Sequence, residues 1–99
     1  MKPMTPKQAK EGAIMSVDKG EEIVGMWASP PIPQTGFYKL LAKQKKDGTI
    51  EWAHLVQRAD GTKELMFRGT AKSKKELNKV VDLASAQLSR IFGPSIKLK

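Results

Sequence analysis

Lysine side chains are the residues of this sequence with the clearest chemical use. Three of them, Lys72, Lys74 and Lys75, fall within four residues, and the 99-residue chain carries 18 Lys and Arg against 10 Asp and Glu, a formal net charge of +8. A charge of this size is self-repulsive, so we expect it either to keep the protein soluble or to bind an anion. Nucleic acid is a common anionic partner of such a chain. An anionic membrane fits less well, since Glu76 and Asp82 lie on the polar side of the only long amphipathic helix that the sequence predicts.

Further cations alternate with aromatic and apolar residues between positions 37 and 68. Single-stranded nucleic acid offers phosphates to cations and base faces to aromatic rings, and stacking one base on such a ring contributes about 1–3 kcal/mol. We therefore expect a surface that binds RNA or single-stranded DNA with little sequence specificity. The candidate binding residues are Lys39, Lys43, Lys45, Trp52, Arg58, Lys63, Phe67, Lys72, Lys74 and Lys75.

The same segment allows a second interpretation, in which its apolar side chains form a core instead of a binding platform. The N-terminal segment or a second subunit would cover that core, with lysines at its rim. The protein would then be a dimeric structural or protein-interaction module. We expect a homodimer under either interpretation, because a small sheet with one helix leaves a face and an edge open. The side chains of this alternative core are Trp52, Phe67, Leu41, Ile50, Val56 and Leu65.

Catalytic and metal-binding chemistry lack partners in this sequence. His54 is the only histidine and there is no cysteine, so the usual acid–base pairs, thiol nucleophiles and zinc ligands are missing. Asp47 and Asp60 each precede a glycine and are typical of turns rather than of a carboxylate pair. We expect a protein that is not an enzyme and uses no cofactor.

Two Asp-Gly pairs, at positions 47–48 and 60–61, separate three runs of strand-forming residues. Asp-Gly favours the type I′ turn, whose twist matches that of the flanking strands and which closes a hairpin with a two-residue loop. The sequence therefore predicts an antiparallel meander. Its strands are expected at about 37–46, 49–58 and 63–71.

Two-residue loops would place Lys46 opposite Thr49 and Ala59 opposite Thr62, and this register assigns every side chain to one face of the sheet. The face expected to carry the helix collects Tyr38, Leu40, Ala42, Gln44, Glu51, Ala53, Leu55, Gln57, Glu64, Met66 and Arg68. The opposite face, basic and aromatic, collects Phe37, Lys39, Leu41, Lys43, Lys45, Ile50, Trp52, His54, Val56, Arg58, Lys63, Leu65 and Phe67.

A C-terminal helix is predicted from about 73 to 92. Ser73 with Glu76 three residues later forms a capping box, in which each side chain accepts a hydrogen bond from the backbone at the other position. Gly93-Pro94 is a strong stop signal. Residues at helical spacing are expected to pack on the sheet: Leu77, Val81, Ala84, Leu88 and Ile91.

The N-terminal third gives weaker signals. Thr5-Pro6 predicts a short helix from residue 5 to about 11, and the apolar run 22–28 predicts an edge strand. Three prolines keep 29–36 out of a sheet ladder, which makes this stretch a connector. The predicted fold class is α+β, a three- or four-stranded antiparallel meander followed by one helix packed on one face.

One domain is expected at this length. It divides into an N-terminal segment (1–35), a β-β-β-α core (36–93) and a basic tail (94–99) that we expect to be frayed and solvated. No apolar run approaches the ~18 residues of a membrane span, and the start of the chain lacks the apolar segment of a signal peptide. We therefore expect a cytoplasmic protein.

The tract Gly69-Thr70-Ala71-Lys72-Ser73-Lys74-Lys75-Glu76 resembles the end of a double-stranded-RNA-binding domain, where a Gly-rich, Ser-Lys-Lys pattern opens the last helix. The resemblance implies that Lys74 and Lys75 bridge phosphates across the narrow major groove. Leu77-Asn78 departs from the Ala-Lys pair of that pattern. The resemblance covers about 60 residues and is specific over eight.

The β-β-β-α order with a basic sheet face also resembles the Alu-RNA-binding subunits of the signal recognition particle. If 22–28 is a strand, the order resembles the Whirly-like group of single-strand binders as well. These likenesses rest on element order and imply nucleic-acid binding by dimers through the sheet face.

Overall fold

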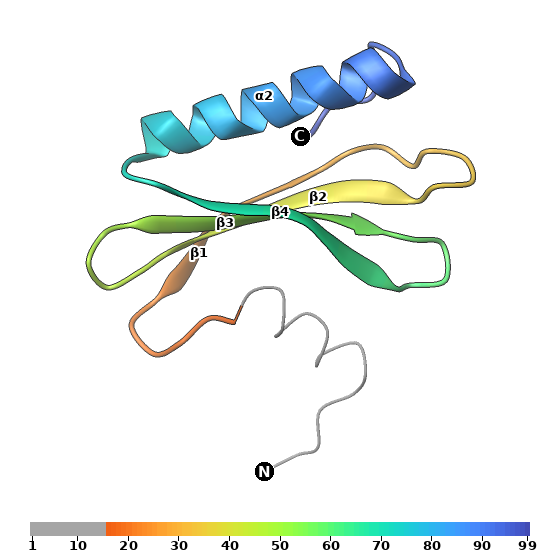
Figure 1. Ribbon diagram of the computed structural model, residues 1–99. Coiled ribbons are helices and arrows are strands. Elements are labelled where there is room, and N and C mark those ends of the chain that lie inside the picture. Colours follow the sequence, from red (N-terminus) through yellow and green to blue (C-terminus); the bar gives the residue numbers. More distant parts are fainter. Residues whose placement is uncertain (1–15) are drawn as a thin grey trace.

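The structure, a computed structural model, describes residues 16–99 and contains one antiparallel sheet with one long helix lying across it (Figure 1). The sheet has four strands in the order β1-β2-β3-β4, so each strand pairs with its neighbours in the sequence. The strands are β1 (Glu22–Ala28), β2 (Phe37–Gln44), β3 (Ile50–Gln57) and β4 (Lys63–Ala71), and the helix is α2 (Lys74–Phe92). The α+β meander with one C-terminal helix is confirmed, and residues 22–28 are its fourth strand. The predicted helix at 5–11 lies outside the described residues.

Both hairpin loops contain three residues, not two, which corrects the predicted register. The Lys45 N–H donates to the Thr49 carbonyl (2.8 Å), and the Arg58 N–H donates to the Thr62 carbonyl (2.8 Å). In each loop only the glycine has a positive φ, +90° at Gly48 and +86° at Gly61. A type I′ turn would need positive φ at the aspartate as well. The aspartates instead keep negative φ and accept the N–H two residues on, at Thr49 and Thr62 (2.9 Å each).

The shift of one residue exchanges the faces of β3 relative to β2. Leu40 lies opposite His54 and Ala42 opposite Trp52, whereas two-residue loops would have placed Leu41 opposite His54. Residues directly opposite each other in an antiparallel pair share a face. The even-numbered residues of β2 and β3 therefore lie on one face, where the predicted pattern had separated them.

A β-bulge at Met66 shifts the register a second time. Between the pairs His54–Phe67 and Leu55–Leu65, β4 contains one residue more than β3. Residues 67–71 of β4 therefore keep the predicted pairing with β3, whereas residues 63–65 are shifted by one position. This shift places Leu65 on the opposite face from Phe67.

The core lies between α2 and one face of the sheet, which we call the helix face. The predicted stripe is confirmed at Leu77, Val81, Ala84 and Leu88, which are buried, but Ile91 is 69% exposed. From the sheet, Leu40, Ala42, Ile50 and Ala71 complete the buried cluster, with Tyr38 and Trp52 packed against it. On the other face, which we call the distal face, Ala53 and Leu55 are buried with Leu41 beside them.

The predicted cap of α2 is present with one difference. The Glu76 N–H donates to the Ser73 hydroxyl (3.2 Å), as a capping box requires. The Glu76 carboxylate, however, accepts from the N–H of Lys72 rather than from that of Ser73. Gly93 ends the helix with a φ of +119° and donates its N–H to the Ser89 carbonyl.

The C-terminal tail is ordered against the sheet, so the predicted frayed tail is wrong. Lys99 and Ala28 exchange two backbone hydrogen bonds of 3.0 Å, which extends the pairing at the end of β1. Leu98 is buried in the main core, and its N–H donates to the Ser85 hydroxyl (3.1 Å). Burial of Leu98 holds the tail in place although Lys97 and Lys99 are charged, because the two lysine side chains extend into solvent.

Candidate nucleic-acid interface

Two lysine-bearing segments meet at one end of the sheet. Gln44 lies opposite Ile50, and Ile50 lies opposite Ala71, so the β2–β3 loop and the start of α2 are separated by two strand spacings, on the order of 10 Å. We call this region the basic end. It consists of Lys45, Lys46, Lys72, Lys74 and Lys75, all of them exposed.

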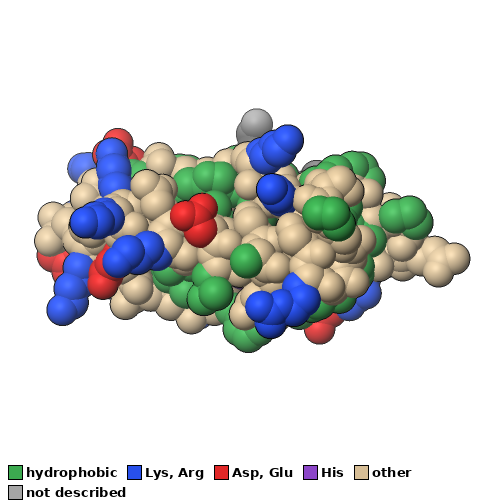
Figure 2. All heavy atoms as spheres, turned by 90° about the horizontal axis from the view of Figure 1, so that it is seen from above, with side chains coloured by type: hydrophobic (Ala, Val, Ile, Leu, Met, Phe, Trp, Pro, Cys, Tyr) green, Lys and Arg blue, Asp and Glu red, His purple; other side chains and the backbone are tan. Residues whose placement is uncertain are grey.

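Figure 2 looks down on α2 and shows Lys and Arg side chains gathered over the end of the molecule where this helix begins (left). Lys74 and Lys75 are the first two residues of α2, immediately after its Ser73 cap. The helix dipole places partial positive charge at this terminus, where backbone N–H groups also face solvent. Side chains and helix terminus therefore favour an anion at the same place.

Acidic side chains reduce the positive charge of the two segments of the basic end by different amounts. Asp47 and Glu76 belong to its two segments, and each accepts a backbone hydrogen bond, from Thr49 and Lys72 respectively. Asp18 and Glu21 line a surface hollow together with Lys45 and Lys46. The start of α2 is therefore the more strongly cationic half of the basic end.

Lys43 was expected on the binding surface, but it is a structural residue. It lies on the distal face and is 5% exposed, with its Nζ 2.9 Å from Oε1 of Glu21 and a second bond to the Ser16 carbonyl. The hydrogen bond from Lys43 lowers the pKa of Glu21, and the same bond raises the pKa of Lys43. Both groups stay charged and paired at neutral pH, and the burial of the Lys43 ammonium group keeps it out of reach of a phosphate.

Trp52 lies on the helix face, as a consequence of the register shift, and does not form an open stacking platform. It is opposite Gly69, and a Cβ at position 69 would lie 2.6 Å from its ring. The indole therefore lies across β4 at the one position in that part of the strand without a side chain. Its Nε1 is buried and has no hydrogen-bond partner among the described residues.

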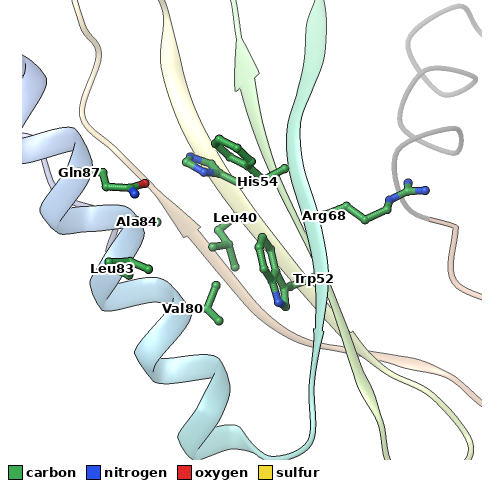
Figure 3. Close-up of a pocket in the computed structure, with 9 residues that line it drawn as sticks. Leu40, Trp52, His54, Arg68, Val80, Leu83, Ala84 and Gln87 are labelled. Carbon is green, nitrogen blue, oxygen red and sulfur yellow. The ribbon is translucent and has the colours of Figure 1, made fainter.

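Phe67 is 58% exposed and forms part of a groove between α2 and strands β3 and β4. Two adjoining cavities of about 270 and 340 Å³ make up this groove and share His54, Phe67, Ala84 and Gln87. In Figure 3, Val80, Leu83 and Gln87 of α2 face Trp52 and His54 of the sheet, while the side chain of Arg68 points away.

His54 forms the floor of the groove. It is 6% exposed, its ring lies 5.6 Å from Tyr38 and 6.1 Å from Phe67 between ring centres, and its Nε2 has no hydrogen-bond partner among the described residues. Burial lowers the pKa of His54 below its ordinary value, so the imidazole is neutral at pH 7.

The remaining predicted residues lie away from the basic end. Lys39 is half-buried on the distal face, with its Nζ 5.7 Å from the Phe37 ring centre. Arg58, beside the β3–β4 loop, forms an exposed ion pair with Glu64. Lys63 begins β4 at the same end of the sheet. The predicted single surface is therefore divided among separate regions.

Two lysines were missed by the sequence-based prediction. Lys46 had been assigned to the end of a strand but belongs to the three-residue loop, where its side chain is exposed. Lys79 is also exposed and follows Lys75 by four residues, which places both on one ridge of α2. That i, i+4 spacing is readable in the sequence and would have identified Lys79.

Among residues 16–99, no three His, Asp or Glu side chains are grouped to hold a metal ion. Within the same residues, no helix is long and apolar enough to cross a membrane. Comparison of the chain with protein-family models, with curated proteins and with solved structures gives no match. The resemblance of the Gly69–Glu76 tract to double-stranded-RNA-binding domains accordingly stays a prediction.

Proposed function

We propose that this protein is a non-enzymatic nucleic-acid-binding protein, for RNA or single-stranded DNA, that holds the phosphate backbone at its basic end. The observation that carries the proposal is the convergence of two lysine-bearing segments on the N-terminus of α2. Segments 45–49 and 72–76 contain five lysines and two acids. A backbone crossing both segments would place successive phosphates near cations that are exposed and already positioned by the sheet.

Phosphate binding of this kind is driven by release of counterions, so its affinity depends on the charge of the nucleic acid and not on its base sequence. For a single strand, log affinity falls with log salt at a slope of about −0.7 for each phosphate neutralised. Five contacts would give a slope of about −3.5. The proposal therefore predicts weak sequence preference and strong dependence on salt.

The test is a salt titration of binding to a labelled single-stranded oligonucleotide, with the wild type and two charge-matched variants. Lys74→Glu with Lys75→Glu reverses two charges at the basic end. Lys97→Glu with Lys99→Glu reverses two exposed charges in the C-terminal tail and controls for net charge. The first variant should bind more weakly with a shallower slope, and the second should keep most of the affinity. Equal behaviour of both variants would refute a localised phosphate site.

A second candidate function is a dimeric protein-interaction module. Exposed apolar side chains border the groove: Phe67 is 58% exposed, Leu83 62% and Ile91 69%. Clustered apolar exposure of this kind is a common mark of a protein interface. Sedimentation of the free protein over a range of concentrations tests this candidate, because a subunit interface at the groove would produce a dimer without nucleic acid.

A further inference from the structure

We propose that the groove between α2 and strands β3 and β4 is a pocket for an unstacked nucleobase. This inference rests on the proposed function, because it assigns a base-binding part to a protein whose basic end would hold phosphates. It restores a ligand-binding role to Trp52 and Phe67, but in a groove under the helix instead of on an open sheet face.

The walls of the groove suit a flat heteroaromatic ring. Phe67 offers an exposed ring face on the sheet side, with the His54 ring 6.1 Å behind it. Leu83 and Ile91 of α2 form the opposite, apolar wall. A base inserted here would stack on Phe67 and cover side chains that are otherwise in water.

Two residues that line the groove each carry a buried nitrogen atom without a hydrogen-bond partner among the described residues: His54 at Nε2, and Trp52 at Nε1, which lies beside Gly69. Buried polar groups are nearly always paired, so two unpaired ones in a single groove suggest a missing partner. The Trp52 N–H can only donate, while a neutral imidazole nitrogen donates or accepts. A nucleobase edge carries acceptors and donors side by side, which a fatty acyl chain does not. The Gln87 side chain at the groove adds an amide that can pair with the same edge (Figure 3).

Helix α2 connects the groove to the basic end. Lys75, Lys79, Leu83, Gln87 and Ile91 follow one another at four-residue intervals and form a single ridge. An i, i+4 row drifts slowly around a helix, so this ridge starts with lysines in solvent and ends with side chains in the groove. A strand whose phosphates follow Lys75 and Lys79 would arrive with its next base at Leu83.

The charge of the groove agrees with this path. No acid is among the described residues that line its two cavities, and Arg90 stands at the end far from the lysines. The groove itself therefore presents no carboxylate among these residues that would repel a polyanion.

The experiment compares two single-stranded oligomers of equal length, one with bases and one abasic, and follows the two indole N–H signals of the protein by NMR. Trp52→Phe identifies the Trp52 signal. The oligomer with bases should shift the Trp52 signal and leave that of Trp27 in place. The abasic oligomer should bind more weakly, with an unchanged salt slope, and should shift neither signal.

A pair of neighbouring substitutions supplies a matched control. Gln87→Trp places a large ring in the groove, whereas Ala86→Trp places the same ring at an exposed position on the side of α2 away from the sheet. The first substitution should lower affinity for the oligomer with bases to that for the abasic one. The second should change neither affinity.

The possible outcomes separate the two proposals. Equal affinity for both oligomers with an unmoved Trp52 signal would overturn the base pocket and leave phosphate binding intact. If neither oligomer binds at low salt, the proposed function fails, and free nucleosides then test the groove alone: a Trp52 shift supports the pocket and none overturns it. If Gln87→Trp dissociates a dimer without changing base-dependent affinity, the groove is a subunit interface and not a base pocket.

Discussion

Two lysine groups that look alike in the sequence have opposite environments in the structure. Lys43, in the middle of β2, is enclosed by an ion pair with Glu21 and a hydrogen bond to the Ser16 carbonyl. Lys74 and Lys75, at the start of α2, are exposed beside a helix terminus. Residue type and local spacing do not separate the two groups. Their positions in the sheet register and along the helix do, so the same side chain stabilises the fold in one region and is available to a ligand in the other.

The same division runs through the aromatic residues. Trp52 is packed between the sheet and α2, while Phe67, its neighbour on the next strand, remains more than half exposed. For residues of one type we therefore expect the interior member to contribute more to stability than the exposed member does.

The largest effect is expected from Trp52→Ala. Removal of this indole should reduce the free energy of unfolding by about 3 kcal/mol, since truncation of a packed aromatic leaves a cavity beside the core. Phe67→Ala should cost less than about 1 kcal/mol because its ring is largely in water already. Urea denaturation of both variants measures the difference. Similar losses for both would mean that the two rings are equally buried.

Lys74→Glu with Lys75→Glu should lower nucleic-acid affinity about tenfold or more, equivalent to about 1.4 kcal/mol, without changing the denaturation midpoint. The same double change at Lys45 and Lys46 should have a smaller effect, because Asp18 and Glu21 already border those lysines. Fluorescence anisotropy at fixed ionic strength gives the ranking. An inverted ranking would place the main phosphate contact on the loop instead of on the helix.

Lys43→Met should lower the melting temperature and leave affinity per folded molecule unchanged. Without the Lys43 ammonium group, the pKa of Glu21 should rise toward its ordinary value, because the hydrogen bond from Lys43 is the main cause that lowers it. Carboxyl NMR titration of Glu21 and thermal denaturation measure the two effects. A loss of affinity with unaltered stability would return Lys43 to the binding surface.

The smallest effect concerns pH. The pKa of His54 is lowered in the folded state by burial, whereas an unfolded histidine titrates near about 6.5. Below that pH the His54 side chain is protonated in the unfolded state but stays neutral in the folded state. The contribution of His54 to the free energy of unfolding is therefore fully present above about 6.5 and declines as pH falls toward the folded-state pKa. His54→Phe should flatten this part of the pH–stability curve. An unchanged slope in the variant would assign the pH dependence to other groups.

The sequence was sufficient for the element order, the four strand positions, the cap at Ser73 and most of the helix stripe, because these follow from local periodicity and turn residues. It was insufficient for the faces of the sheet. Asp-Gly is compatible with two loop lengths that differ by one residue, and the choice depends on the φ angles of Asp47 and Asp60. One residue of register decides on which face Trp52 and His54 lie.

Of the candidate binding residues, the helix-start lysines depended only on local signals, and the structure leaves them exposed as expected. The burial of Lys43 depends on Glu21 and Ser16, more than 20 residues earlier in the chain. No window of sequence around β2 contains that information. The groove likewise depends on how α2 lies relative to strands β3 and β4, which periodicity does not encode.

The bulge at Met66 has a consequence beyond its effect on register. β4 is an outer strand, and an outer strand with regular pairing positions is a template for the growth of the sheet into aggregates. The extra residue interrupts that template near its middle, since a second strand cannot pair continuously across a position where the alternation of side chains breaks. Deletion of Met66 would produce a straighter edge flanked by Leu65 and Phe67, and we expect such a protein to aggregate more readily than the wild type. We therefore expect the irregularity in β4 to limit edge-to-edge association of a protein that leaves apolar side chains exposed.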